Sequence, residues 1–350
     1  MRIYLSDIET SNGFYPITTL RKLEEVRTGI FSIREKWLRI SNKQSYPLEI
    51  VDHKEESDIA IPAHLIPQAS INLDRFFAEA KRTTDECIAL NHWWDIVLHN
   101  ETFIKDDIGL LQHFPAIQIP EYVFQKGPHP LLIHEDAEIE QCSINTQDGP
   151  VVIDKGAKIM MGAMLRGPIY LGEYSTVKMG AQLYAGTNIG KYCIVGGEVK
   201  NTVFQGYSNK SHHGYVGDSF IGEWCNLGAG TSNSNLKNTA GSIRVWNQST
   251  QVFQKGPSKL GMAMGDHVKT AINTSITSGT VISSFSTIFS ENGSALPKFL
   301  PLFSWGIDKG AHYKLDNLLV EISRWMKLKN QPLDDETREK IINLYKQHIS

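Results

Sequence analysis

Residues 153–195 read IDKGAKIMMGAMLRGPIYLGEYSTVKMGAQLYAGTNIGKYCIV. An aliphatic residue returns at every sixth position of this stretch: Ile153, Ile159, Leu165, Leu171, Val177, Leu183, Ile189 and Val195. A period of six fits neither an amphipathic helix nor a simple alternating strand. It fits one short strand followed by one turn, repeated three times in each coil of a triangular prism. We therefore predict a parallel β-helix in which these aliphatic side chains point into the prism.

The same spacing extends the repeat in both directions. A looser prelude contains Ile133 and Ile139, and a later block contains Met264, Thr270, Ile276, Ile282 and Ile288. In between, the spacing resumes at Tyr215, Ile221 and Leu227. Because Tyr215 follows Val195 by twenty residues rather than eighteen, residues 201–213 (NTVFQGYSNKSHH) are expected to bulge from the coil. The pattern resembles the left-handed parallel β-helix of hexapeptide-repeat proteins, in which stacked coils stabilise one another.

Helical patterns flank the repeat on both sides. Upstream, residues 18–40 and 91–112 are charged, contain tryptophan and predict helix-rich segments. Downstream, residues 313–330 place apolar side chains at helical spacing. A second C-terminal helix is predicted over 333–347, with Asp334 or Asp335 as its N-cap.

The composition is that of an ordinary globular protein, with 41% hydrophobic and 21% charged residues among 350. A formal net charge of -3 gives no basic excess for nucleic acid. The four cysteines form no C-x-x-C pair, which argues against a zinc knuckle and a disulfide framework. The sequence has no apolar run of membrane-spanning length, and its start, MRIYLSDIET, has no apolar signal-peptide core. We expect a reduced, cytoplasmic protein that binds neither nucleic acid nor a membrane.

Two adjacent histidines, His212 and His213, stand where the repeat is interrupted. In an arbitrary loop they would be solvated side chains without a role. An extruded loop, however, would line a cleft between neighbouring prisms, and stacked coils would hold nearby polar groups rigidly. Polar residues surround the pair in the sequence: Lys200, Tyr215, Asn226, Asn233, Asn235 and Lys237. The histidine pair is therefore the candidate centre of a functional site.

The segment around the histidines resembles the acetyltransferase half of a bifunctional family. Its motifs are EVK, a histidine twelve residues later, YVGD, NLGAGT and SN. These motifs are similar to the N-acetylglucosamine-1-phosphate uridylyltransferase/glucosamine-1-phosphate acetyltransferase family. The segments YPITTLRKLEEVRTGIFSIREKW, WDIVLHNETFIKDD and PKFLPLFSWG look like its divergent Bacteroidetes-type branch, usually described as sugar nucleotidyltransferase-like.

The resemblance implies His212 as the catalytic base, because it precedes Tyr215 by three residues, whereas His213 matches no functional position. The residues implied for sugar or sugar-phosphate binding are Lys200, Tyr215 and Asn226. The residues implied near the thioester of acetyl-CoA are Gly228, Ala229, Gly230 and Asn235. The implied protein is a homotrimer that acetylates an amino sugar or its 1-phosphate, a step in nucleotide-sugar and cell-envelope precursor synthesis.

One position departs from the family pattern. The arginine that the family places eighteen residues before the lysine is Gln182 here. An arginine fork binds phosphate through two parallel hydrogen bonds, which neither glutamine nor lysine reproduces. Lys178 is the substitute available by position, as a point charge only.

Histidine is the residue type that this chemistry needs. An amino sugar is mostly an ammonium ion near neutral pH and attacks a thioester only after losing a proton, which histidine can accept. The tetrahedral oxyanion needs a fixed donor, for which we expect a backbone N–H of the GAGT turn at 228–231. No metal ion takes part in this reaction.

The fold class predicted for the whole chain is mainly β, with three parts. Residues 1–125 would form an α/β nucleotidyltransferase-like domain, residues 126–306 the β-helix, and residues 307–350 a C-terminal helical segment. The β-helix would be the acyltransferase domain.

The N-terminal domain lacks the phosphate loop of the family. In place of L-x-x-G-x-G-T-R-M, the chain reads IYLSDIETSNGFYPITTLRK, in which Gly13 has no arginine directly after it. The remaining basic candidates are Arg21, Arg27 and Lys36, with a solvated helix face as the alternative interpretation. Asp7 is a candidate ligand for Mg²⁺. We expect nucleotidyl transfer to be weak or absent.

Other functions stay open at this point. The chain could be a sugar-1-phosphate nucleotidyltransferase whose β-helix is an oligomerisation stem, or a non-catalytic protein that binds a nucleotide sugar. A γ-type carbonic anhydrase is set aside because it needs three zinc-ligating histidines. His212 and His213 are adjacent and cannot both point to one metal from an extended strand.

Overall fold

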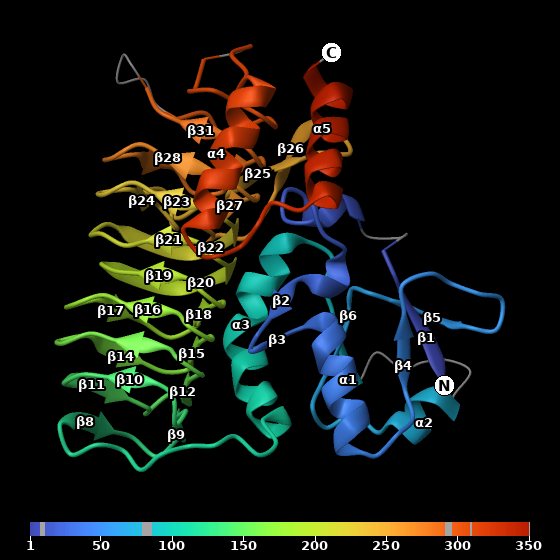
Figure 1. The fold of residues 1–350 in the computed structure, drawn as a ribbon, viewed down its shortest axis with the longest axis vertical. Helices are drawn as coiled ribbons and strands as arrows, with labels where there is room; N and C mark the ends of the chain where they lie inside the picture. The colour runs from blue at the N-terminus through green and yellow to red at the C-terminus, as the bar shows by residue number, and fades with distance from the viewer. Residues whose placement is uncertain (8–10, 79–85, 291–295, 309, 350) are drawn as a thin grey trace.

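The computed structural model describes all residues except 8–10, 79–85, 291–295, 309 and 350. Its largest part is a parallel β-helix, which confirms the prediction from the six-residue repeat. Figure 1 shows the N-terminal region packed along one side of the β-helix and the C-terminal helices near its far end. The exact domain boundaries stay a prediction.

Each coil of the β-helix contributes one strand to each of three faces. Face 1 contains β9 (Leu131–Ile133), β12 (Val151–Ile153), β15 (Ile169–Leu171), β18 (Thr187–Ile189), β27 (Ala263–Met264), β30 (Val281–Ile282) and β32 (Phe299–Leu300). Face 2 contains β10 (Glu138–Ile139), β13 (Lys158–Ile159), β16 (Thr176–Val177), β19 (Ile194–Val195), β21 (Asn209–Lys210), β23 (Asn226–Leu227), β28 (Lys269–Thr270) and β31 (Thr287–Ile288). Face 3 contains β8 (Val123–Lys126), β11 (Cys142–Asn145), β14 (Met164–Arg166), β17 (Gln182–Leu183), β24 (Ser232–Asn233) and β29 (Ser275–Ile276). Two long strands turn from face 3 onto face 1: β20 (Glu198–Gly206) and β22 (Tyr215–Glu223).

The interior of the prism is the aliphatic core that the repeat predicts. All eight residues from Ile153 to Val195 at six-residue spacing are at most 3% exposed and belong to one buried cluster. The later block from Met264 to Ile288 is buried as well. Each such side chain contributes about 1.5–3 kcal/mol when it leaves water, so the stacked coils stabilise one another.

The coil register changes where the sequence pattern breaks. Val195 pairs with Lys210, 15 positions later, and Val199 pairs with Val216, 17 positions later, so both spacings fall short of the regular eighteen residues. Val216, rather than Tyr215, therefore points into the prism, and Tyr215 lies partly exposed on the outside. The predicted bulge at 201–213 is wrong, because this segment forms β20 and β21 within the coil.

The residues that do leave the coil come later. Ile221 pairs with Met264, 43 positions further along the chain, so one coil contains a long insertion. The insertion includes an antiparallel hairpin of β25 (Arg244–Asn247) and β26 (Val252–Lys255). Its Leu260 packs into the core that the N-terminal region shares with face 1.

Aromatic side chains stack along the corner between faces 1 and 2. Successive ring centroids of this aromatic ladder lie between 4.3 and 6.3 Å apart. Its residues, all with φ between 55° and 65°, are Tyr174, Tyr192, Tyr207, Trp224, His267, Phe285 and Phe303. A positive φ strains a residue that has a Cβ, and stacking of about 0.5–1.5 kcal/mol per pair offsets that strain.

The N-terminal region is α/β. It contains a parallel sheet of order β4 (Glu49–Val51), β1 (Arg2–Ser6) and β5 (Ile59–Pro62). Two short antiparallel pairs accompany this sheet. One joins β2 (Arg27–Thr28) to β3 (Phe31–Ser32), and the other joins β6 (Leu65–Pro67) to β7 (Cys87–Ala89). Its helices are α1 (Ile33–Lys43), α2 (Leu73–Ala78) and α3 (Trp93–Asp107). The predicted helix at 18–40 is therefore correct only from Ile33 onward. A capping box starts α1 there, since Ser32 and Glu35 each accept the other's backbone N–H.

The N-terminal region covers face 1. The outward column of this face runs through Leu132, Val152, Tyr170, Asn188, Val203, Phe220, Ala263, Val281 and Phe299. Most of these side chains share one core with the N-terminal region, and α3 lies against β20 and β22. Asn188 joins the two parts by donating to the carbonyl of Gly29 (2.6 Å) and to Oδ1 of Asn100 (3.0 Å).

The C-terminal helices match their predicted positions. α4 (Leu315–Lys327) buries its apolar stripe near the end of the aromatic ladder, and α5 (Asp335–Ile349) follows it. Asp334 is the N-cap of α5, because its Oδ1 accepts the N–H of Thr337 at 2.7 Å. Among the residues that the structure describes, no helix combines the length and the apolar character that a membrane span requires.

Candidate active site

The predicted histidines lie at the corner between faces 2 and 3, which we call corner 2–3. His212 and His213 form an exposed turn between β21 and β22. The backbone of this turn is held on two sides. Lys210 Nζ donates to the His212 carbonyl (2.9 Å), and the N–H of Gly230 donates to the His213 carbonyl (3.1 Å). The two imidazoles are therefore exposed side chains on a fixed backbone.

A buried lysine supports this turn. Lys210 occupies the interior position opposite Val195 and is 2% exposed. Its Nζ donates to the carbonyls of Gly196 (2.7 Å) and His212, and so ties two successive turns of corner 2–3 together. Burial lowers the pKa of Lys210 to about 8. The sequence pattern missed this residue because a lysine at an interior position looks like a break in the repeat.

Tyr215 heads a hydrogen-bonded network on face 3. Asn235 Nδ2 donates to the Tyr215 hydroxyl (2.8 Å) and to Asp218 Oδ2 (2.5 Å). Asn201 donates to Asp218 Oδ1 (2.8 Å), and Lys259 Nζ lies 3.7 Å from Asp218 Oδ2. Burial, followed by the Asp218 charge, raises the pKa of Tyr215 to about 12. Asp218 and Lys259 were not among the predicted site residues, although Asp218 ends the YVGD motif.

The sugar-binding candidates do not all share one face. Val199 and Val216 point inward, so their neighbours Lys200 and Tyr215 point outward from adjacent strands of face 3. Asn226 lies in β23 on face 2, beyond corner 2–3. A single copy of the chain therefore places Lys200 and Tyr215 on adjacent strands of face 3, with Tyr215 opposite Glu198, and Asn226 on another face.

Neither Gln182 nor Lys178 stands in register with Lys200, because Gln182 pairs with Glu198. The pairing of β17 with β20 puts Tyr184, rather than Gln182, at the position of Lys200 on the preceding coil. The same position one coil earlier belongs to Arg166. Lys178 lies at corner 2–3, one coil before Gly196 and Gly197. Eighteen-residue counting failed here because the coils next to Lys200 are irregular.

The glycine turn of the GAGT motif stacks directly on the histidine turn. Gly230 has a φ of 78°, in the left-handed region that favours glycine, and its N–H is bonded to His213. The N–H of Gly228 donates to Thr270 Oγ1 (3.0 Å). Within the described residues, the N–H of Ala229 between them donates to no acceptor. Ala229 therefore offers an amide that an external oxygen can use.

The basic candidates of the N-terminal region are not on a solvated helix face. Lys36 is fully buried, with its Nζ 2.7 Å from Asp107 Oδ1. Arg21 and Arg27 line a cavity between the N-terminal region and the β-helix. Arg21 Nη1 donates to Asp266 Oδ1 at 2.9 Å, across 245 positions of sequence.

Asp7 lies at the end of β1, beside residues 8–10, and its role as a Mg²⁺ ligand stays a prediction. Its Oδ2 accepts the N–H of Leu23 (3.2 Å), and its Oδ1 is buried without a partner. The expected phosphate loop falls in part on residues 8–10, outside the described residues. Among the described residues, no group of three or more His, Cys, Asp or Glu side chains could hold a metal ion.

Comparisons with known proteins find local similarity. No protein-family model matches the chain. A bifunctional sugar-1-phosphate nucleotidylyltransferase/acetyltransferase of Sulfurisphaera tokodaii is 39% identical over 92 residues, which are 26% of this chain and 23% of the relative. The bifunctional protein GlmU of Methanocaldococcus jannaschii is 39% identical over 87 residues, which are 25% and 21%. Among solved structures, the polySia-specific acetyltransferase NeuO is 10% identical with a TM-score of 0.33, over 59% of this chain and 97% of that chain. The sequence similarity thus spans less than a quarter of each of these two curated relatives.

Proposed function

We propose that the chain is an acetyl-CoA-dependent N-acetyltransferase that acts on an amino sugar or an amino sugar phosphate. The observation that carries this proposal is the stacking of the exposed histidine turn on the glycine turn with its free amide, beside the network that fixes Tyr215. The local similarity to an enzyme with acetyltransferase in its name supports it. The assignment to the Bacteroidetes-type branch stays a prediction.

In the proposed reaction, His212 acts as the general base. The amine of the sugar attacks the acetyl carbonyl carbon, the C–S bond of the thioester breaks, and the proton from nitrogen passes to the His212 imidazole. The fixed turn backbone limits where this imidazole can lie, because Lys210 and Gly230 hold the carbonyls of both histidines. No covalent intermediate with the protein is required.

Three further groups complete the proposed chemistry. The Ala229 N–H, which donates to no described residue, is the candidate donor to the developing oxyanion. Tyr215 accepts a hydrogen bond from Asn235, so its own O–H remains available to a ligand oxygen. Lys200, pointing outward from the neighbouring strand, adds a positive charge for a phosphate, if the acceptor has one.

The separation of Asn226 from Lys200 and Tyr215 favours a site completed by a second copy of the chain, as in the proposed homotrimer. Corner 2–3 also exposes apolar side chains that lack a partner in the isolated chain: Met161, Met179 and Ile272. Burial of this apolar edge would stabilise an assembly in which face 2 of one copy approaches face 3 of the next.

The wild-type protein is expected to have three times the chain mass of 39.3 kDa in light scattering. The double variant Met161→Glu/Met179→Glu places two carboxylates on the apolar edge and should dissociate the assembly. Leu328→Glu, at a side chain that is 74% exposed beyond α4, is the matched control and should leave the mass unchanged. A wild-type mass of one chain would contradict a shared site.

The proposed activity is tested by release of free CoA from acetyl-CoA across a set of amino sugars and their 1-phosphates. At least one acceptor should give turnover that depends on both substrates. The four cysteines are all buried, so a thiol reagent reports released CoA with little background from the protein. Absence of turnover with every amino sugar tested would contradict the proposal.

Nucleotidyl transfer is expected to be weak or absent. The basic candidates Lys36 and Arg21 are engaged with Asp107 and Asp266, so neither is free to bind a phosphate. The measurement is pyrophosphate release from UTP and a sugar 1-phosphate in the presence of Mg²⁺. Rapid release would show that the divergent N-terminal region is active after all.

A further inference from the structure

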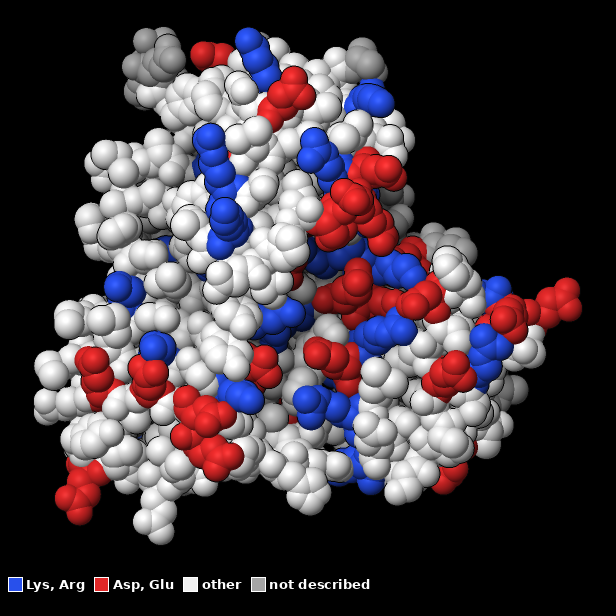
Figure 2. All heavy atoms as spheres, in the orientation of Figure 1, with Lys and Arg blue, Asp and Glu red and all other residues white. Residues whose placement is uncertain are grey.

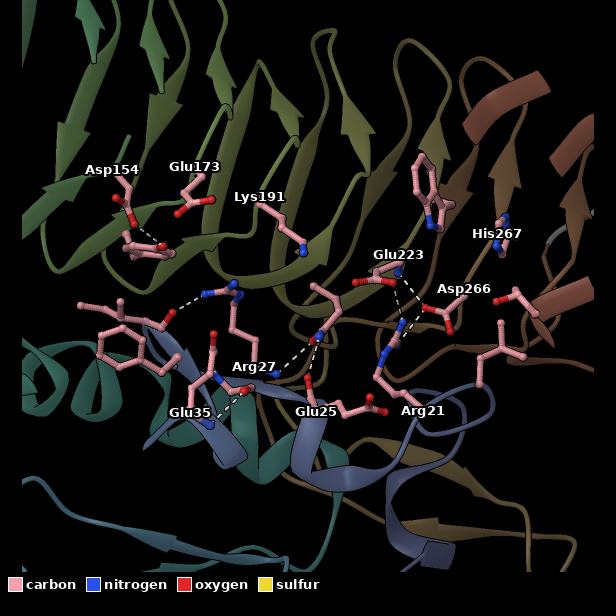
Figure 3. A pocket seen from close by; sticks show the side chains of 18 of the residues that line it. Arg21, Glu25, Arg27, Glu35, Asp154, Glu173, Lys191, Glu223, Asp266 and His267 are labelled. Atoms are coloured by element: carbon pink, nitrogen blue, oxygen red, sulfur yellow. Dashed lines mark hydrogen bonds and ion pairs between the residues drawn. The ribbon is translucent and has the colours of Figure 1, made fainter. Parts of the chain in front are cut away.

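Cations and carboxylates are mixed at the junction between the N-terminal region and the β-helix. Figure 2 shows both signs of charge gathered there, and Figure 3 shows Arg21 between Glu223 and Asp266 in the cavity of this junction. The two ion pairs of Arg21 are 3.1 and 2.9 Å long. Arg21 therefore has its counter-ions within the chain.

A group of cations of a different kind lies at the corner between faces 3 and 1, which we call corner 3–1. Backbone hydrogen bonds join successive rungs of this corner: the N–H of Gly261 donates to the carbonyl of Asp218 (2.7 Å), and the N–H of Gly279 donates to that of Gly261 (2.5 Å). A Cβ on Gly279 would lie 2.7 Å from the carbonyl oxygen of Arg244. The hairpin of β25 and β26 therefore packs directly on corner 3–1.

Two cations stand opposite each other on this hairpin. Arg244 and Lys255 are Cα partners on β25 and β26, and both residues are exposed. Like charges directly opposite on an antiparallel pair of strands are destabilising. The hairpin therefore carries a repulsion that a bound anion would remove.

Two lysines from other segments join this pair. Lys237 Nζ donates to the carbonyl of Ser242, two residues before Arg244, and Lys298 Nζ donates to the carbonyl of Ser278 (2.5 Å), on the turn that packs against the hairpin. Both ammonium groups are thereby held at the base of the hairpin. Burial lowers the pKa of Lys298, and the positive charges of Lys237 and Arg244 lower it further. These three cations therefore lie close enough to repel one another.

No described carboxylate balances the four cations, which we call the cation cluster: Lys237, Arg244, Lys255 and Lys298. Within the part of the chain that the structure describes, none of them forms an ion pair. The whole chain has a formal net charge of -3, so this local excess of positive charge does not follow from composition. A compact group with several negative charges would relieve the repulsion.

Aromatic rings lie beside the cation cluster on the hairpin. Phe253 is the Cα partner of Trp246 and is 39% exposed. The Arg244 guanidinium lies 5.7 Å from the centroid of the Phe253 ring, and Trp246 stacks on Phe299 with 4.4 Å between centroids. A nucleobase stacks on aromatic side chains whatever its identity, and neighbouring cations attract its phosphates. Among compact anions, a nucleotide therefore matches this surface better than phosphate alone.

We propose that the cation cluster and Phe253 bind a nucleoside diphosphate, either free or linked to a sugar. The diphosphate contacts the cations and the base stacks on Phe253. This binding does not depend on the proposed acetyl transfer. Gly279 is two rungs from Asp218 of the Tyr215 network, which is about 10 Å at the usual spacing of strands. A sugar joined to the diphosphate could therefore extend as far as that network.

The test measures binding by calorimetry on the full-length chain at low ionic strength. UDP and UDP-N-acetylglucosamine are the probes, and uridine and inorganic diphosphate each lack one half of the ligand. The informative variants are the double variant Arg244→Gln/Lys298→Met and the single variant Phe253→Leu. The matched control is Arg324→Gln/Lys327→Met, which removes two positive charges from exposed positions of α4. Melting temperatures check that each variant folds.

We expect UDP to bind more tightly than either uridine or diphosphate. The double variant of the cluster should weaken UDP binding about tenfold or more, and Phe253→Leu about fivefold or more, whereas the α4 control leaves it nearly unchanged. UDP-N-acetylglucosamine binding more tightly than UDP would identify a sugar-linked ligand, and equal or weaker binding would identify the free nucleotide.

Several outcomes would overturn the proposal. Absence of UDP binding, or UDP binding that the cluster variant leaves unchanged, would show that these cations form no nucleotide site. Diphosphate binding as tightly as UDP would remove the base from the ligand. Displacement of UDP by acetyl-CoA would assign the cluster to the cosubstrate of acetyl transfer, and tighter binding of single-stranded RNA would assign it to nucleic acid.

Discussion

Replacement of His212 by alanine is expected to lower the acetyl-transfer rate by about 10²- to 10⁴-fold, the usual loss when a positioned general base is removed. The physical reason is that the sugar amine would lose the group that accepts its proton during attack. His212 is exposed on a turn whose backbone is fixed by Lys210, so the deletion removes an imidazole without disturbing a core. The rate is measured at saturating acetyl-CoA, with the melting temperature as a check on folding.

His213→Ala is the matched control for this prediction. The two histidines are adjacent and both exposed, so general effects on the turn should be shared by both variants. We expect His213→Ala to retain most of the activity, because the spacing to Tyr215 favours His212. Loss of activity only in His213→Ala would shift the base by one residue, and full activity in both would place the base elsewhere.

Replacement of Lys36 by methionine is expected to destabilise the protein by about 3–5 kcal/mol. Lys36 Nζ and Asp107 Oδ1 lie 2.7 Å apart, and both side chains are fully buried. Methionine keeps much of the volume but leaves the Asp107 carboxylate as an uncompensated buried charge. A loss of this size is a large part of the 5–15 kcal/mol by which most proteins are stable. It is measured by urea unfolding.

The free energy of unfolding of the Lys36→Met variant should depend on pH. Burial raises the pKa of Asp107 to about 6, although the positive charge of Lys36 lowers it. Removal of the lysine should therefore raise the pKa of Asp107 further. Between the usual carboxyl pKa of about 4 and this raised value, the folded variant binds a proton that the unfolded chain has lost. The stability of the variant should therefore fall as the pH rises from 5 to 8.

The control for this variant lies on the same helix. Lys43, at the C-terminal end of α1, is exposed and forms no ion pair with any described residue. Lys43→Met should change the free energy of unfolding by no more than about 0.5 kcal/mol. Equal effects of the two lysine variants would contradict the importance of the buried pair.

The β-helix was predictable from sequence because its signal is local and repeated. Each coil needs one inward aliphatic residue per face, so spacing alone identifies Ile153 to Val195 as core. The amphipathic pattern of α4 is local in the same way, and so is the N-cap of Asp334. For these elements the pattern of neighbouring residues is enough to choose the structure.

The candidate site was predictable only in part. The motif identified Tyr215 and Asn235, which the structure joins by a hydrogen bond. It could not place Asn226 on a different face, nor show that Lys210 is an interior residue, because both depend on coils of irregular length. A buried lysine satisfied by two carbonyls looks, in the sequence, the same as one in a solvated loop.

Only the tertiary structure joins segments that are far apart in the chain. Arg21 and Arg27 come from the N-terminal region, and Asp266 and His267 come from a late coil, yet all four line one cavity. Periodicity reports whether a side chain points inward or outward, but not which distant segment covers an outward face. The strands of face 1 could therefore be predicted from the sequence. The N-terminal region buries this face and creates the cavity through long-range packing, which leaves no local pattern in the sequence.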